Sequence, residues 1–435
     1  MSKPVFPPGW YNLQEFSLLD ALFGRRSRRF ALGATLPDGP LAFTSQQPPL
    51  PLSELERMLV LTATGGVTGW HHLLERHPRY APKLPDYPAS AAGRTFPSAA
   101  GWQTSELFFT DDQGVYFFAT RDAAPSVFPA PDGSLDPEAL LTAHRARIRQ
   151  LADQRLYLPA GSPHMDGHNS WCANLPGSLL IIPVADLAQH MLAVLCLMVQ
   201  NGACLYDNVH HERIDGLQNF RHLVDVENPA PLSEVELAVI TMATAELATS
   251  CYAGMLILQA MGLGGWMFTG INWLSVLGAS GDPAVPGLGF HYETNSRWTT
   301  PNPTGLPGVF TAFCPPHYPD LRAAVDALVE RKFGLGGPFH PQTSGPWQET
   351  SRVRGSAQPF AEEMAACVAV MAQAIFDRFG KFPGTIPSLY SKTFLQAHHL
   401  DLAYYDQHFA PGAYLWTHAQ HMADWHPADD ILVVV

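Results

Sequence analysis

Apolar residues recur along the chain at spacings that predict several helices and one β-hairpin. Ser53 and Glu56 form a capping box, and the apolar positions that follow them are three and four residues apart, as on one face of a helix. Two short apolar runs, 106–110 and 114–120, flank the polar residues 111–113. This arrangement is typical of two antiparallel strands joined by a tight turn.

The same patterns predict further elements whose ends are marked by capping residues and glycines. Helices are expected at 12–23, 137–154, 187–201, 233–261, 320–333 and 360–379, and a buried strand at 178–184. The longest helix begins with a second capping box, Ser233 and Glu236, and is apolar on nearly all sides, so we expect it in the core or in an interface. Helices and strands do not alternate as in βαβ units, which predicts an α+β fold.

The composition is that of a chain that hides much of its surface. Of its 435 residues, 46% are hydrophobic and only 15% are charged, so we expect a large core and a subunit interface. A formal net charge of −13 repels phosphate backbones and argues against nucleic-acid binding. Six cysteines without a CxxC pair indicate reduced thiols, the start of the chain lacks an apolar leader, and 187–199 is too short to cross a membrane. We therefore expect a cytoplasmic protein that binds no membrane.

Three segments carry residues suited to ligand binding. The first, Arg25-Arg26-Ser27-Arg28-Arg29, places four guanidinium groups within five residues, where they repel one another unless an anion or several carboxylates lie among them. The second, 96–103, combines small residues with the amide of Gln103 and suits a flat ligand. The third, 261–270, has three glycines after a long helix and permits close backbone approach. Taken singly, each is better explained as an ordinary turn or connection.

Taken in order, these segments resemble the FMN-dependent nitroreductase-like flavoproteins. The N-terminal part is most similar to the azoline dehydrogenases, which mature thiazole- and oxazole-containing peptides. The matching motifs are 25–29 (RRSRR), 51–55 (PLSEL), 97–101 (PSAAG), 114–116 (GVY) and 261–264 (MGLG). The resemblance covers about residues 15–125 well and 230–275 moderately, and it rests on the order of the motifs.

The resemblance implies a mixed, mostly antiparallel sheet flanked by helices in an intertwined homodimer, with FMN between the subunits. The implied FMN-binding domain is 12–300 with an insert at about 125–230, and 301–435 is a C-terminal helical extension that packs on the partner subunit. The implied cofactor-binding residues are Arg25, Arg26, Ser27 and Arg29 at the phosphate and ring edge, Pro97, Ser98, Gly101 and Gln103 along the ribityl and ring portions, and Thr269 and Gly270 near N5, where a hydride enters or leaves.

The implied activity is two-electron transfer through FMN with a small-molecule or peptide substrate, and NAD(P)H is a candidate electron donor. No catalytic side chain is assigned. Thr269 replaces an acidic residue that is common in the family, and Arg297 is the only candidate that we find for a second basic cluster at the phosphate. These departures leave a flavin-binding protein without turnover as an alternative. Within the enzyme class, a substrate-specific peptide dehydrogenase is another.

The histidine-rich tail offers a rival function. Its histidines are His398, His399, His408, His418, His421 and His426. His418 and His421 are three residues apart, so on a helix they would share a face and could chelate a metal. Aromatic residues are interleaved with these histidines, so the composition favours an arm that packs on a partner, and no metal is predicted. A metal-binding interaction protein is the remaining alternative.

Overall fold

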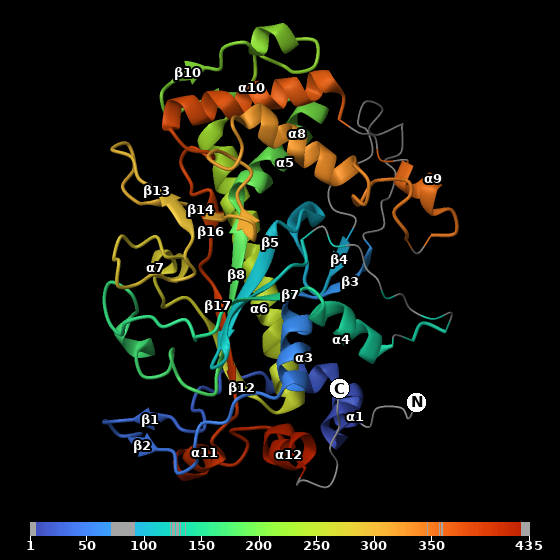
Figure 1. The fold of residues 1–435 in the computed structure, drawn as a ribbon. Helices are drawn as coiled ribbons and strands as arrows, with labels where there is room; N and C mark the ends of the chain where they lie inside the picture. The colour runs from blue at the N-terminus through green and yellow to red at the C-terminus, as the bar shows by residue number, and fades with distance from the viewer. Residues whose placement is uncertain are drawn as a thin grey trace.

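A mixed α+β fold is built around one large antiparallel sheet (Figure 1). The computed structural model describes residues 6–70, 92–121, 123, 127, 130, 132–134, 136–345, 347–355, 357 and 360–427. The strands of the sheet, in spatial order, are β12 (Gly264–Phe268), β17 (Phe394–His398), β8 (Leu179–Asp186), β5 (Ser105–Asp111), β6 (Gly114–Phe118) and β7 (Ile148–Ala152), and β16 (Leu389–Tyr390) pairs with β8. Every pairing among them is antiparallel, as expected from the sequence.

Helices and smaller groups of strands surround this sheet. The helices are α1 (Pro8–Glu15), α2 (Leu18–Gly24), α3 (Glu54–Gly65), α4 (Pro137–Arg145), α5 (Leu187–Gln200), α6 (Leu232–Met261), α7 (Trp273–Leu277), α8 (Leu321–Phe333), α9 (Thr350–Gly355), α10 (Glu362–Phe379), α11 (Leu402–His408) and α12 (Trp416–Trp425). The smaller groups are β1 (Thr35–Leu36) with β2 (Phe43–Thr44), β3 (Val67–Trp70) with β4 (Ala92–Arg94), β9 (Leu205–Asp207) with β10 (Glu212–Arg213) and β11 (Ala230–Pro231), and β14 (Asn302–Leu306) with β13 (His291–Glu293) and β15 (Phe310–Thr311).

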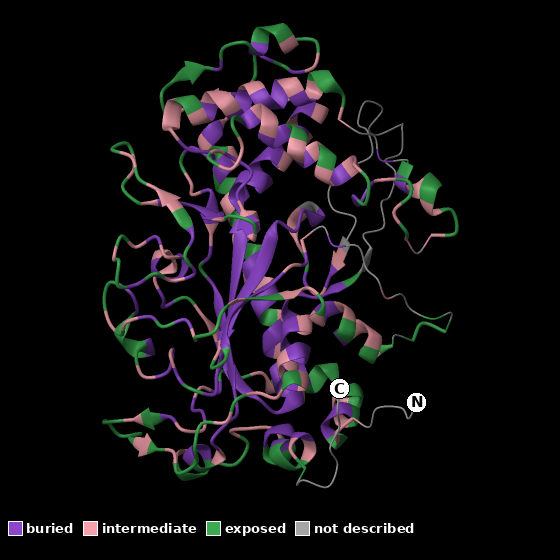
Figure 2. Cartoon of the chain, viewed as in Figure 1, coloured by how far each residue is buried: buried purple, intermediate pink, exposed green. Residues whose placement is uncertain are grey.

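Alternate residues of β5 face two different cores, because successive side chains of a strand point to opposite sides. Leu107 and Phe109 belong to the core that includes residues of α3 and α6. Phe108 lies on the other face, with its ring 5.3 Å from that of Phe290 and 6.0 Å from that of Phe310. Figure 2 shows the central strands buried along their length. Helices α5, α8 and α10 form a separate layer at one end of the sheet, at the top of Figure 1.

Several local predictions are confirmed. Helix α3 begins with the expected capping box, in which the Ser53 N–H donates to Glu56 Oε2 at 2.6 Å. The hairpin formed by β5 and β6 turns at the expected polar residues. Helix α6 ends as expected at Gly262, whose φ of +75° is favourable only for glycine.

Two predicted helix boundaries are wrong. The helix expected at 12–23 is two helices, because Phe16 is extended and the Ser17 side chain caps a second helix by accepting from the Leu19 N–H. The helix expected at 137–154 ends at Arg145, and the chain continues as strand β7, which pairs with β6. In both places a competing partner replaces the helical hydrogen bonds.

The expected capping box at Ser233 and Glu236 is also wrong. Helix α6 begins at Leu232, and the Glu236 carboxylate is buried. It accepts hydrogen bonds from the backbone N–H groups of Gly384 and Thr385, at 2.6 and 2.8 Å. The Glu236 carboxylate therefore binds a segment distant in sequence and does not cap the start of α6.

Two segments that the sequence placed outside the main body of the domain supply its central strands. Strand β8 lies within the expected insert at 125–230, and β17 lies within the expected extension at 301–435. Each has neighbours on both sides in the sheet, and all of their residues are buried. Some residues at the start of the insert lie outside the described part of the chain. The expected division at residue 300 is therefore not a boundary of the sheet.

Helix α6 has an uncharged outer face. By length and composition it is the one described helix that could cross a membrane, a test that core helices of soluble proteins also pass. Between residues 235 and 261 its only charged side chains are Glu236 and Glu246, and both are buried. The outward positions, among them Leu237 and Tyr252, are apolar or small. Such a face favours burial against another protein surface.

Candidate functional site

The basic run is held between the edge of the sheet and the C-terminal tail. Arg28 forms an antiparallel bridge with Gly265 of β12, whose N–H donates to Arg28 O at 2.7 Å. Farther along, the Leu32 N–H donates to His399 O at 3.0 Å. Residues 28–32 are thus fixed by backbone hydrogen bonds to two segments that are distant in sequence.

Arg28 points into the protein. Its Nη1 donates to Gln259 Oε1 at 2.5 Å, and its Nε donates to Ala413 O at 2.9 Å. Burial lowers the pKa of its guanidinium group to about 10. Because successive side chains of an extended segment point to opposite sides, Ser27 and Arg29 lie on the side away from Arg28.

Arg29 lies over an aromatic surface. Its guanidinium carbon is 4.9 Å from the ring centre of Trp266 and 5.7 Å from that of Trp171. Trp266 in turn stacks on Phe268. Arg29 Nη2 donates to His168 O at 3.4 Å, whereas its buried Nε has no hydrogen-bond partner among the described residues. The site therefore combines a cation and flat rings.

The other basic side chains of the run also lack counter-charges. Within the described part of the chain, Arg25, Arg26 and Arg29 form no ion pair with a carboxylate. Arg26 faces solvent and donates to Phe23 O and Arg25 O, Arg25 is half-buried, and Ser27 is exposed. Although the net charge of the protein is −13, its described residues supply no carboxylate to these three guanidinium groups, which suits an anionic ligand.

The end of β12 lies beside this surface. Asn169 Nδ2 donates to Gly270 O at 3.2 Å. A Cβ atom on Gly270 would lie only 2.1 Å from that nitrogen and 3.1 Å from His168 Nε2, so the backbone approach requires a glycine. His168 O also accepts from Arg29, and Thr269 next to Gly270 is exposed. The structure therefore brings the basic run, 25–29, close to the glycine-containing segment, 261–270.

The second motif, residues 96–103 (the Pro97 loop), contacts α6 at a different place. Ser98 Oγ donates to Glu246 Oε2 at 2.5 Å, near the middle of the helix. The basic run meets the same helix at Gln259, thirteen residues further on. At a rise of 1.5 Å per residue, this separation is about 20 Å along the helix axis. Within one chain, the Pro97 loop is not part of the surface formed by the other two motifs.

The Pro97 loop has a strained backbone. Gly101 and Gln103 have φ angles of +68° and +48°, and residues other than glycine seldom adopt the left-handed region. The Gln103 N–H donates to Ser98 Oγ at 3.1 Å, while the buried Gln103 Oε1 has no partner among the described residues. Pro97 is exposed. The loop thus presents an unused acceptor next to an exposed turn.

Arg297, the candidate for a second basic cluster, lies in another part of the molecule. Its Nη1 donates to Arg378 O at 2.6 Å, near the C-terminal end of α10. That helix belongs to the layer at the top of Figure 1, far from β12. Arg297 therefore does not complete a basic cluster with Arg25 and Arg29 in one chain.

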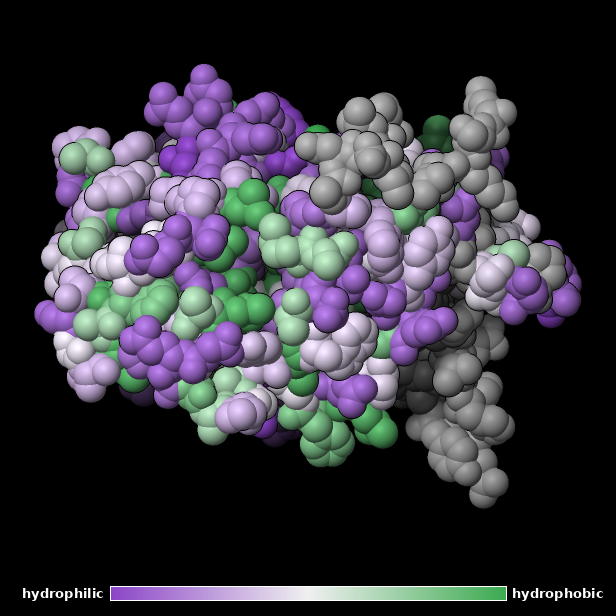
Figure 3. Space-filling view, turned by 90° about the horizontal axis from the view of Figure 1, so that it is seen from below, coloured by the Kyte–Doolittle hydropathy of each residue, from purple (hydrophilic) through white to green (hydrophobic). Residues whose placement is uncertain are grey.

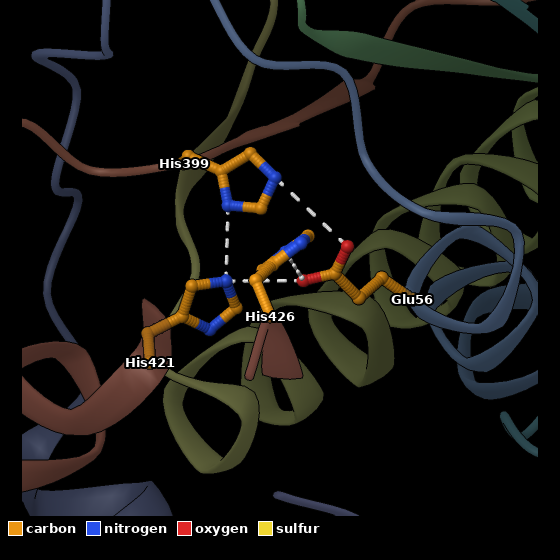
Figure 4. Close-up of side chains that lie close together, drawn as sticks. All are labelled: Glu56, His399, His421 and His426. Carbon is orange, nitrogen blue, oxygen red and sulfur yellow. Dashed lines mark hydrogen bonds and ion pairs between the residues drawn. The ribbon is translucent and has the colours of Figure 1, made fainter. Parts of the chain in front are cut away.

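Three histidines of the tail converge on Glu56 (Figure 4). His399 follows β17, His421 lies in α12, His426 follows α12, and Glu56 lies in the first turn of α3. One nitrogen or oxygen atom from each side chain lies within 4.8 Å of the other three. We call this group the histidine cluster. It joins residues from both ends of the sequence in a mostly buried position.

The other tail histidines are placed differently. His418, the possible partner of His421 in the metal-binding alternative, is not a member of the cluster, and its Nδ1 accepts from the Leu415 N–H at 3.2 Å. His398 is buried in β17, and burial lowers its pKa to about 3. Glu56 is the member that the sequence analysis missed, since its only local signal was that of a helix cap.

Glu56 is ionised in spite of its burial. Burial alone raises the pKa of its carboxyl group, but the imidazole rings of His421, His426 and His399 outweigh that effect and hold the pKa well below its usual range. Burial lowers the pKa of His399 to about 4, whereas the hydrogen bond to Glu56 raises the pKa of His426. The cluster therefore contains one carboxylate among imidazole rings.

Comparison with known proteins adds little to these observations. No protein-family model matches the chain, and no curated protein matches it. Among solved structures, the chain is similar to a candidate nitroreductase from Ralstonia eutropha, with 15% sequence identity, coverage of 59% of this chain and 71% of that chain, and a TM-score of 0.26. So slight a likeness does not bear on the function, for which the residues described above are the basis.

Proposed function

We propose that this chain is an FMN-dependent oxidoreductase of the nitroreductase-like kind. One observation carries the proposal: Arg29 lies over Trp266 beside Gly270, and among the described residues neither Arg29 nor Arg25 is paired with a carboxylate. FMN joins a flat ring system to a phosphate group. Guanidinium donors suit the phosphate and the polar ring edge, while aromatic side chains suit the flat ring.

The residues fit such a ligand in specific ways. Arg25 and Ser27 would bind the phosphate, and the half-buried Arg29 would face the polar edge of the ring. Thr269 and Gly270 would present backbone groups to the reacting edge. Bound FMN supplies two-electron transfer to or from a small-molecule or peptide substrate, with NAD(P)H as a candidate donor. The protein side chains bind and orient it.

We further propose that the site is completed by a second copy of the chain. In a two-fold dimer, positions at equal distances from the axis meet. If two copies of α6 pack antiparallel with the axis near Ala253, residue 246 of one copy meets residue 260 of the other. The Pro97 loop, held at Glu246, would then lie beside the basic run of the second copy, held at Gln259. This pairing would remove the separation of about 20 Å found within one chain.

Exposed apolar side chains support this arrangement. Leu18, Leu22 and Phe23 of α2 are exposed, as is Trp416 of α12, and α2 lies against α6. Figure 3 shows hydrophobic side chains gathered on the face seen from below. Apolar surfaces of this kind mark interaction sites. Because all six cysteines are buried and unpaired, we also propose a cytoplasmic location.

FMN titration tests the proposal. Arg25→Ala and Arg29→Ala each remove a charge-assisted contact, so we expect FMN affinity to fall about ten- to a hundredfold, or about 1.5–3 kcal/mol. Fluorescence titration of the apo-proteins measures this loss. The control is Arg352→Ala, which removes an exposed arginine paired only with Glu349. Arg28→Ala is unsuitable because Arg28 is buried. Equal affinities in the wild type and all three variants would refute the assignment.

A further inference from the structure

In the histidine cluster, the hydrogen-bond partners of His399 and His421 place the proton of each ring on the nitrogen that points away from the centre. His421 Nδ1 lies 2.7 Å from Met261 O, and His399 Nε2 lies 3.3 Å from Pro51 O. A backbone carbonyl only accepts, so each of these nitrogens carries the proton of its ring. In neutral rings, His421 Nε2 and His399 Nδ1 are then unprotonated.

Those two unprotonated nitrogens face each other and the carboxylate. His399 Nδ1 is 2.9 Å from His421 Nε2, and His421 Nε2 is 3.0 Å from Glu56 Oε1. His426 Nε2 lies 3.2 Å from the same oxygen. Three acceptors at such distances repel one another, and one extra proton satisfies only one pair of them. A cation at the centre would satisfy all four ligand atoms at once.

The surroundings match those of a metal site. Ligands at about 2.0–2.1 Å from a tetrahedral zinc ion lie about 3.3 Å apart. Three spacings in the cluster are 2.9, 3.0 and 3.2 Å, and all four atoms lie within 4.8 Å of one another, so binding requires only small shifts of the side chains. Metal-binding histidines usually donate their second ring N–H to a carbonyl or carboxylate, as His421 does to Met261 O and His399 to Pro51 O. Glu56 Oε2, the oxygen not used at the centre, accepts from the Ser53 N–H at 2.6 Å.

We propose that Glu56, His399, His421 and His426 bind one divalent transition-metal ion of the zinc class. Three imidazoles and one carboxylate fill a tetrahedral shell, so the site is closed and structural. Burial of Glu56, His399 and His421 excludes water from three of the four ligands. The ion ties the start of α3 to α12 and to the chain after β17, and through Met261 O it is connected to the end of α6.

Metal analysis of the full-length protein, without FMN, tests this site. After dialysis against excess zinc and then metal-free buffer, we expect about one zinc ion per chain by mass spectrometry. Cobalt should give the intense visible absorption of a tetrahedral complex. Glu56→Gln and His426→Ala should weaken zinc binding at least about a hundredfold, since loss of an outer-shell partner alone costs ten- to a hundredfold. His426 is only half-buried, so its variant tests the site even if Glu56→Gln does not fold.

Two buried histidines outside the cluster provide matched controls. His418 lies three residues before His421 in α12, and His398 precedes His399. His418→Ala and His398→Ala should keep the zinc content and the cobalt spectrum of the wild type. The proposal is overturned if the wild type retains no more zinc than Glu56→Gln and His426→Ala, or if the two control variants lose as much as those two do.

Discussion

The basic run and the histidine cluster both meet the C-terminal end of α6, yet they differ in their electrostatics. Arg28 anchors the run at Gln259, and His421 anchors the cluster at Met261. The run is partly exposed, and no carboxylate in the described part of the chain pairs with its arginines. The cluster is mostly buried and places its carboxylate among imidazole rings.

This difference indicates what each place can bind. A partly exposed surface with unneutralised guanidinium groups can exchange a large anionic ligand, because only part of the ligand must lose its water. A closed shell of four ligand atoms suits an ion that is taken up once and retained. We therefore propose that reactive chemistry takes place at the basic run and that the histidine cluster stabilises the fold.

The largest loss of stability is expected when the carboxylate of the histidine cluster is removed. Glu56→Ala removes the only carboxylate and leaves its buried partners uncompensated, so we expect the free energy of unfolding to fall by about 3–5 kcal/mol. Urea denaturation at neutral pH measures it. Glu54→Ala, two residues earlier, removes an exposed carboxylate that is 2.7 Å from Arg145 and should cost about 0–1 kcal/mol. Similar small losses in both variants would show that the cluster is not a stabilising unit.

A smaller loss, in dimer affinity, should test whether a second copy of the chain covers the basic run. Ala253→Glu places a charge on the outer face of α6 where we propose that a second copy packs. We expect dimer affinity to fall about tenfold or more, or about 1.4 kcal/mol, with a parallel loss of bound FMN. Light scattering over a dilution series measures the proportions of monomer and dimer. Ala238→Glu, fifteen residues away on the same helix, should leave the dimer intact. A wild type that is monomeric at micromolar concentration would contradict the arrangement.

The smallest change in stability at neutral pH is expected at His144, a buried histidine that belongs to neither region. Burial lowers the pKa of His144 to about 4, and its Nε2 accepts from the Val67 N–H at 2.8 Å. Protonation therefore favours the unfolded chain, so this contribution is complete above about pH 6.5 and is lost as the pH falls towards 4. Melting temperatures across that range should fall less steeply for His144→Gln than for the wild type. Parallel curves would show that His144 does not contribute.

The sequence predicted the basic run better than the histidine cluster, because the residues of the run are adjacent in sequence and those of the cluster are not. The arginines of the basic run are neighbours in sequence, and alternation along an extended segment separates Arg28 from Arg29. The histidine cluster joins residues 56, 399, 421 and 426, and no spacing rule connects them. Glu56 was recognised only as a helix cap, because that partner lies three residues away.

The same reasoning explains the errors in the fold. The hairpin of β5 and β6 and the capping box of α3 depend on contacts within a few residues, and both were predicted correctly. The central strand β17 depends on pairing with β12 and β8, which are more than a hundred residues away in the sequence. Glu236 was assigned to a helix cap, but its partners lie at 384 and 385.

The hydrogen bond from the Leu32 N–H to His399 O has a thermodynamic consequence. It connects the segment that carries Arg29 to a residue that we propose binds metal. An ion that orders the tail would therefore also order the arginines, and FMN affinity would rise with zinc. Reciprocity then requires FMN to raise zinc affinity by the same factor, because the coupling free energy belongs to the pair of ligands and not to either one.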